Sequence, residues 1–99
     1  MATYQVVSWR DIPLQVRVRG HRKGRVSRSL SERFQQAADA AAMHEGKTES
    51  DAYLTEMRSQ AWVEREGEPH VVAEAVVAEL EAEFSSERLK AMVQNGGRA

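Results

Sequence analysis

The chain has 99 residues, of which 41% are hydrophobic and 29% are charged, and it contains no cysteine. This composition is typical of one globular domain, and it excludes disulfide bonds, thiolate metal sites and cysteine nucleophiles. Because the N-terminus lacks the pattern of a signal peptide and no apolar run could span a bilayer, we expect a cytoplasmic protein that makes no membrane contact.

The net charge of −1 hides an uneven distribution of charge along the chain. Residues 1–34 carry eight basic and two acidic side chains, whereas residues 35–99 carry six basic and thirteen acidic ones. This predicts one basic and one acidic surface, which attract each other, a second copy or a ligand. A chain of this length buries roughly 60–70% of its unfolded surface, so a homodimer would also enlarge a thin core.

The first quarter of the chain predicts two strands and a basic loop. Residues 3–9 are β-branched and aromatic, and residues 10–13 break this strand because Pro13 removes a main-chain donor. Residues 14–19 then alternate, with Leu14, Val16 and Val18 toward a core and Gln15, Arg17 and Arg19 toward solvent. Residues 20–24 (GHRKG) predict a flexible loop, and residues 25–28 either extend the sheet or lead into a helix.

Residues 29–32 (SLSE) form a capping box, in which Ser29 and Glu32 would bond each other's main-chain amides. The helix that follows should end near Glu45, with Gly46 in the left-handed conformation. Its apolar face would consist of Leu30, Phe34, Ala37, Ala38 and Ala41.

The second half of the chain predicts a short helix, a strand and a long helix. Residues 51–66 fit a helix or a strand, and we favour a helix over 49–53 and a strand within 55–65, because a bare hairpin would be marginal. Pro69 suits the first position of the long helix. Its core positions would be Val72, Val76, Leu80 and Phe84. A short helix over 87–93 and a frayed tail from about residue 95 complete the chain.

Two kinds of catalytic site lack a signature in this sequence. The three histidines lie in separate elements without a second ligand at metal spacing, so we expect no metal site. No serine has the setting of a nucleophile, and no glycine-rich loop has phosphate-binding spacing.

Two surfaces are candidate contact sites. The first is the basic hairpin, in which Arg17 and Arg19 on one strand face are extended by Arg22, Lys23 and Arg25. It could contact phosphates, but no aromatic side chain is interleaved, so a solvated face that protects a sheet edge is the favoured interpretation.

The second candidate is the turn that contains Trp9, Arg10 and Asp11. It is either an exposed recognition loop or a strand end with Trp9 in the core and Arg10 paired with Asp11. Trp62 would join Trp9 in a surface with two tryptophans if the third strand pairs with the first.

Five segments in order carry a resemblance to a known family. They are SWRDIP at 8–13, LSERFQQAADAAAM at 30–43, DAYLTEMRSQAWVEREGEP at 51–69, VVAEAVVAELEAEF at 71–84 and ERL at 87–89. Together they resemble the small bacterial "virulence factor" domain family, whose domain is also attached to larger conserved virulence factor proteins in staphylococci. The resemblance implies no catalytic residues. Because free-standing members of the family are often encoded beside corrinoid and tetrahydrofolate methyl-transfer proteins, it implies an accessory role in one-carbon metabolism.

We therefore expect an α+β fold, in which a mainly antiparallel sheet of about three strands carries two main helices on one face in the order β-β-α-β-α. The expected function is that of a non-enzymatic accessory module that docks on a partner protein or forms a homodimer. The alternatives are an accessory subunit or chaperone of folate- or corrinoid-dependent methyl transfer and a nucleic-acid-binding hairpin. We expect no cofactor, although a folate or corrinoid would suit the basic surface.

Overall fold

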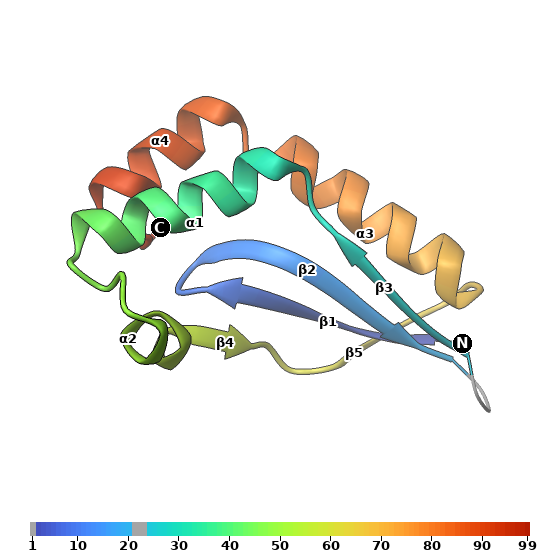
Figure 1. Cartoon of the computed structure of the whole chain (residues 1–99). Coiled ribbons are helices and arrows are strands. Elements are labelled where there is room, and N and C mark those ends of the chain that lie inside the picture. Colours follow the sequence, from blue (N-terminus) through green and yellow to red (C-terminus); the bar gives the residue numbers. More distant parts are fainter. Residues whose placement is uncertain (1, 21–23) are drawn as a thin grey trace.

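The structure is a computed structural model that describes residues 2–20 and 24–99. In this part of the chain a five-stranded sheet is combined with four helices (Figure 1). The strands are β1 (Ala2–Trp9), β2 (Ile12–Arg19), β3 (Arg25–Ser29), β4 (Met57–Ser59) and β5 (Val63–Arg65). The helices are α1 (Glu32–His44), α2 (Ser50–Thr55), α3 (Pro69–Glu83) and α4 (Ser86–Gln94). The α+β class is confirmed, with five strands in the described residues where about three are expected and with α2 and α4 in addition to the two main helices.

The strand β1 lies in the middle of an entirely antiparallel sheet. It pairs with β2 on one side and with both β4 and β5 on the other, while β3 pairs with β2 and ends the sheet. The single strand expected within 55–65 is therefore two strands of three residues each, which add to the same side of β1. Residues 25–28, for which the sequence left two alternatives, continue the sheet as β3.

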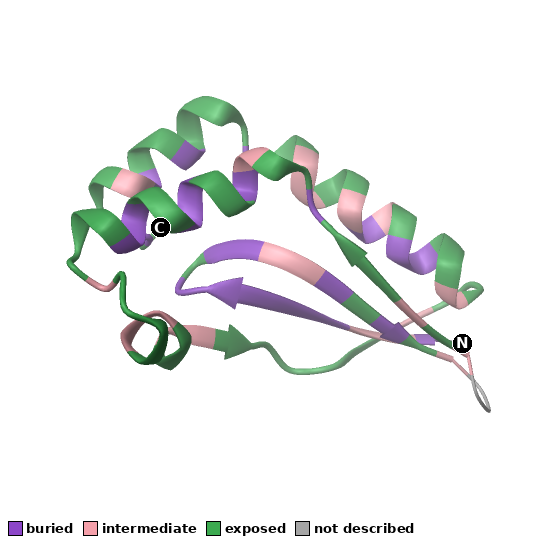
Figure 2. Cartoon of the chain, viewed as in Figure 1, coloured by how far each residue is buried: buried purple, intermediate pink, exposed green. Residues whose placement is uncertain are grey.

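The helices α1, α3 and α4 lie on one side of the sheet (Figure 1). Alternation along the strands decides which residues face them. Val6 pairs with Val16, and both are buried against Val72 and Val76 of α3. A register shift after Val7 then aligns Trp9 with Ile12, and this pair packs against α1 and α4. In Figure 2, buried residues colour most of β1 and separate segments of β2, α1, α3 and α4.

Some helix ends are determined by the residues at that end, and others involve contacts with residues far away in the sequence. Gly46 follows α1 with φ of 69°, and Pro69 begins α3, as the sequence predicts. The capping box of Ser29 and Glu32 is wrong, because Ser29 ends β3, α1 begins at Glu32, and the residue before it, Ser31, makes no side-chain capping bond. Instead, Glu81 of α3 accepts hydrogen bonds from the Ser31 amide at 2.6 Å and the Ser31 hydroxyl at 2.8 Å.

The C-terminal tail packs onto the first turn, whereas the sequence predicts fraying from residue 95. Gly96 and Gly97 are buried. The Gly97 carbonyl accepts from the Asp11 amide at 2.9 Å, and Asp11 accepts from the Ala99 amide at 2.8 Å. Gly97 has φ of 89°, and a Cβ there would meet the Trp9 ring at 2.7 Å. Only glycine permits this close approach.

Candidate functional site

The turn between β1 and β2 belongs to the interior of the molecule. Trp9 is fully buried, its ring stacks on Tyr53 with centroids 5.6 Å apart, and its indole N–H donates to the Tyr53 carbonyl. Arg10 is only 4% exposed. The alternative of an exposed recognition loop is therefore wrong for Trp9 and Arg10. Asp11 is exposed, and its carboxylate accepts a hydrogen bond from the Ala99 amide of the tail.

Arg10 pairs with residues far away in the sequence, and the expected local pair with Asp11 is absent among the described residues. Its guanidinium donates to Glu45 at 2.8 Å, to Glu56 at 3.0 Å and to the Gly96 carbonyl at 2.7 Å. The end of α1, the start of β4 and the tail thus converge on one buried cation. We call Arg10, Glu45 and Glu56 the Arg10 cluster.

The Arg10 cluster makes stability depend on pH. Hydrogen bonds from Arg10 lower the pKa of Glu45 and of Glu56, although desolvation acts in the opposite direction. A lowered pKa stabilises the fold above the unfolded value of about 4.5, and this stabilisation is lost as the pH falls through the folded pKa.

We therefore expect the free energy of unfolding to fall more steeply below about pH 4.5 in the native chain than in Arg10→Ala. Urea denaturation of both proteins across acidic pH measures this difference. If the two curves stay parallel, the pKa values of Glu45 and Glu56 do not depend on Arg10.

The strongest candidate for a binding surface is the side of the sheet that α1, α3 and α4 leave open. Register places Arg19 directly opposite Arg25 and Arg17 directly opposite Ser27, and all four residues are exposed. Trp62, in the link between β4 and β5, lies beside them. Its ring centroid is 4.0 Å from the Arg19 guanidinium carbon, which is a cation–π contact.

We name Arg17, Arg19, Arg25 and Trp62 the arginine face. Together with Val18, Val26 and Ser27 they line a hollow of about 360 Å³. Trp62 supplies the aromatic group that the sequence of the hairpin lacks. Arg22 and Lys23, which belong to the predicted surface, lie outside the described residues. The expected two-tryptophan surface does not form, because Trp9 is buried.

The arginine face has an unbalanced charge. In the described residues, no carboxylate lies within 4.0 Å of Arg17, Arg19 or Arg25, although five other arginines pair with glutamates in this way. Like charges directly opposite on neighbouring strands are destabilising, as they are for Arg19 and Arg25. Glu64 lies on the same face but beyond β1, across from Thr3. The face therefore suits an anionic ligand supplied from outside.

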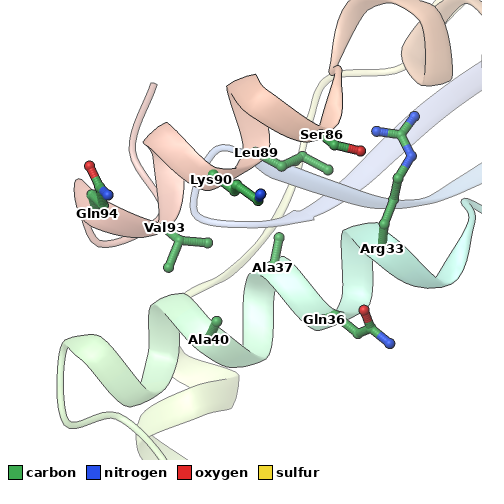
Figure 3. A pocket seen from close by; sticks show the side chains of 9 residues that line it. All are labelled: Arg33, Gln36, Ala37, Ala40, Ser86, Leu89, Lys90, Val93 and Gln94. Carbon is green, nitrogen blue, oxygen red and sulfur yellow. The ribbon is translucent and has the colours of Figure 1, made fainter.

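A second hollow of about 470 Å³ lies between α1 and α4 (Figure 3). Its lining residues are Arg33, Gln36, Ala37, Ala40, Ser86, Leu89, Lys90, Val93 and Gln94. These described residues include no carboxylate and no imidazole. Arg33 is already engaged, since its guanidinium pairs with Glu81 at 2.9 Å.

Other classes of site are absent from the described residues. Within residues 2–20 and 24–99, no three His, Cys, Asp or Glu side chains are placed to hold a metal ion. The helices in this part of the chain include none with the length and apolarity needed to cross a bilayer.

Comparison with known proteins bears on the family. No curated protein and no solved structure matches the chain. A family model described as "Virulence factor" matches residues 7–93, which include β2 to β5, α1 to α3 and all of α4 except Gln94. The resemblance seen in the sequence is thereby confirmed, and the chain belongs to the virulence factor family.

Proposed function

We propose that this protein is a non-enzymatic binding module that docks on an acidic surface of a partner protein through its arginine face. The observation that supports this most is the direct opposition of Arg19 and Arg25 without a carboxylate near either, among the described residues. An acidic partner would neutralise this pair. Trp62, 37% exposed and stacked on Arg19, adds the amphipathic area that interface centres favour.

An acidic protein surface is a better match than a nucleic acid. A duplex or single strand presents charge along its whole length, and the residues outside the first 34 carry thirteen acidic against six basic side chains. These would repel a polyphosphate wherever it extended past the arginine face. A protein partner can confine its charge to the area that matches.

The test compares two double variants that each remove two exposed cations. Arg17→Ala/Arg25→Ala changes the arginine face, whereas Arg58→Ala/Lys90→Ala changes exposed cations elsewhere. Immobilised protein is used to capture partners from the source cells at moderate salt. We expect Arg17→Ala/Arg25→Ala to weaken binding of the captured protein about tenfold or more, and the control pair to leave it unchanged. Equal binding by both variants, or no captured protein, contradicts the proposal.

Nucleic-acid binding is the second candidate, because the stacked Trp62 offers a base a platform beside cationic side chains. Titration with a labelled single-stranded oligonucleotide tests it. The affinity for the oligonucleotide should fall steeply as the salt concentration rises, and it should be lower for Arg17→Ala/Arg25→Ala than for the native chain. A flat response to salt removes this candidate.

The same titration with a tetrahydrofolate or a cobalamin, followed by tryptophan fluorescence, tests the accessory role in one-carbon metabolism.

A further inference from the structure

The outer edge of β3 presents main-chain groups that no other strand of the described chain pairs with. In an antiparallel pair, alternate residues exchange hydrogen bonds with the partner strand and the residues between them point theirs away. The Gly20 amide donates to Gly24 and the Leu30 amide donates to Leu14, so the bonded positions on β3 are Val26 and Arg28. It follows that Arg25, Ser27 and Ser29 direct their amides and carbonyls away from β2, and all three are exposed.

The side chains of these edge residues belong to the open side of the sheet. Arg25 and Ser27 lie opposite Arg19 and Arg17, so they share the side that α3 does not cover. A strand added to β3 would place the residues opposite Arg25 and Ser27 on that side too, since directly opposed side chains share a face. Carboxylates at alternate positions of this strand would therefore lie next to the arginine face.

We propose that the edge of β3 receives an extended acidic segment of the partner protein as an added strand, with carboxylates at alternate positions. This inference rests on the proposed function. The charge of β3 argues against a second copy as the occupant, because self-pairing would bring Arg25 and Arg28 of both copies together. The Arg28 guanidinium donates to the outward Ser27 carbonyl at 3.1 Å, and the added strand replaces this local bond.

One substitution blocks the edge without breaking the sheet. Proline lacks an amide hydrogen, and edge strands tolerate it where the amide faces solvent. The Ser27 amide faces away from β2, so Ser27→Pro keeps the β2–β3 ladder and removes a donor that an added strand needs. Ser27→Ala is the matched control, because it removes the hydroxyl and keeps the donor.

The test uses two labelled octapeptides of identical composition. In one, glutamate alternates with valine, and in the other the valines form one block and the glutamates another. Anisotropy at low ionic strength should show about tenfold tighter binding of the alternating peptide, weakened about fivefold or more by Ser27→Pro and unchanged by Ser27→Ala. Amide exchange of the native chain should slow at Arg25, Ser27 and Ser29 when this peptide binds, which gives a readout even if Ser27→Pro unfolds.

The other results separate this inference from the proposed function. If both peptides bind equally, Arg17→Ala/Arg25→Ala weakens them and Ser27→Pro does not, the added strand is wrong and the arginine face stands. If neither peptide binds the native chain, both proposals fail. If the native chain sediments as a dimer that Ser27→Pro converts to a monomer, the occupant is a second copy and the acidic segment is wrong.

Discussion

Arg10→Ala is expected to lower the free energy of unfolding by about 3 kcal/mol. Removing one partner of a buried ion pair costs about 3–5 kcal/mol, and the lower end applies because the side chains of Glu45 and Glu56 are 31% and 20% exposed. The Gly96 carbonyl also loses its donor. Urea denaturation at neutral pH measures the change.

Two control variants separate charge from backbone strain. Arg10 has φ of 50°, where a side chain costs roughly 1–2 kcal/mol, so Arg10→Gly should be about 1 kcal/mol less destabilising than Arg10→Ala. Arg98 lies 3.6 Å from the same Glu45 oxygen but is 59% exposed, and Arg98→Ala should cost less than about 0.5 kcal/mol. An Arg10→Ala protein as stable as Arg98→Ala would show that the Arg10 cluster does not stabilise the fold.

Phe34→Ala is expected to cost about 3–5 kcal/mol, as truncation of a buried phenylalanine generally does. Phe34 is fully buried, and its ring meets the Phe84 ring edge-on with centroids 6.2 Å apart. The surrounding helix surface is built largely from alanines, which have no side-chain length with which to fill the cavity. The midpoint of chemical denaturation should fall at an unchanged slope.

Phe34→Leu is the matched control, since it keeps most of the buried volume and should cost about 1.5 kcal/mol or less. A loss for Phe34→Ala below that of Phe34→Leu would contradict the assignment of Phe34 as the anchor of α1. Phe34 does not line the hollow of the arginine face, so the fraction of Phe34→Ala that remains folded should bind the alternating peptide like the native chain.

Local signals in the sequence predict the elements that local chemistry decides. The alternation of residues 14–19 predicts the buried Val16 and Val18 and the exposed Arg17 and Arg19. Gly46 and Pro69 mark helix ends because their backbone preferences act without help from the rest of the fold. The four-residue repeat of α3 likewise predicts the burial of Val72 and Val76.

Distant partners decide the features that the sequence does not reveal. The capping box fails because Ser29 ends β3 and α1 begins only at Glu32, after Ser31, which Glu81 binds from fifty residues further along the chain. The partner of Arg10 is not its neighbour Asp11, since Glu45 and Glu56 reach it from 35 and 46 residues away. The strands β4 and β5 have three residues each, which is too short for an alternating pattern to emerge.

One part of the candidate site is predicted by the local sequence, and another part depends on distant contacts. Strand alternation predicts that Arg17 and Arg19 share one face, whereas Arg25 joins that face because residues 25–29 form β3, which the sequence leaves open. Trp62 is predicted as a contact residue beside Trp9 and not beside Arg19, because its approach to Arg19 depends on where β5 adds to β1. The feature of the sequence that could have indicated β5 is the β-branched Val63, which follows Trp62 and pairs with Tyr4.

The convergence on Arg10 also bears on the order of folding. β1 and β2 are adjacent in the chain, and closing such a short connection is fast. The turn that joins them nevertheless holds a cation whose acceptors arrive with residues 45, 56 and 96. Contacts of such large sequence separation form slowly, so the hairpin that forms first is completed last. During synthesis on the ribosome, the Gly96 carbonyl therefore becomes available to Arg10 only after 86 further residues have been added.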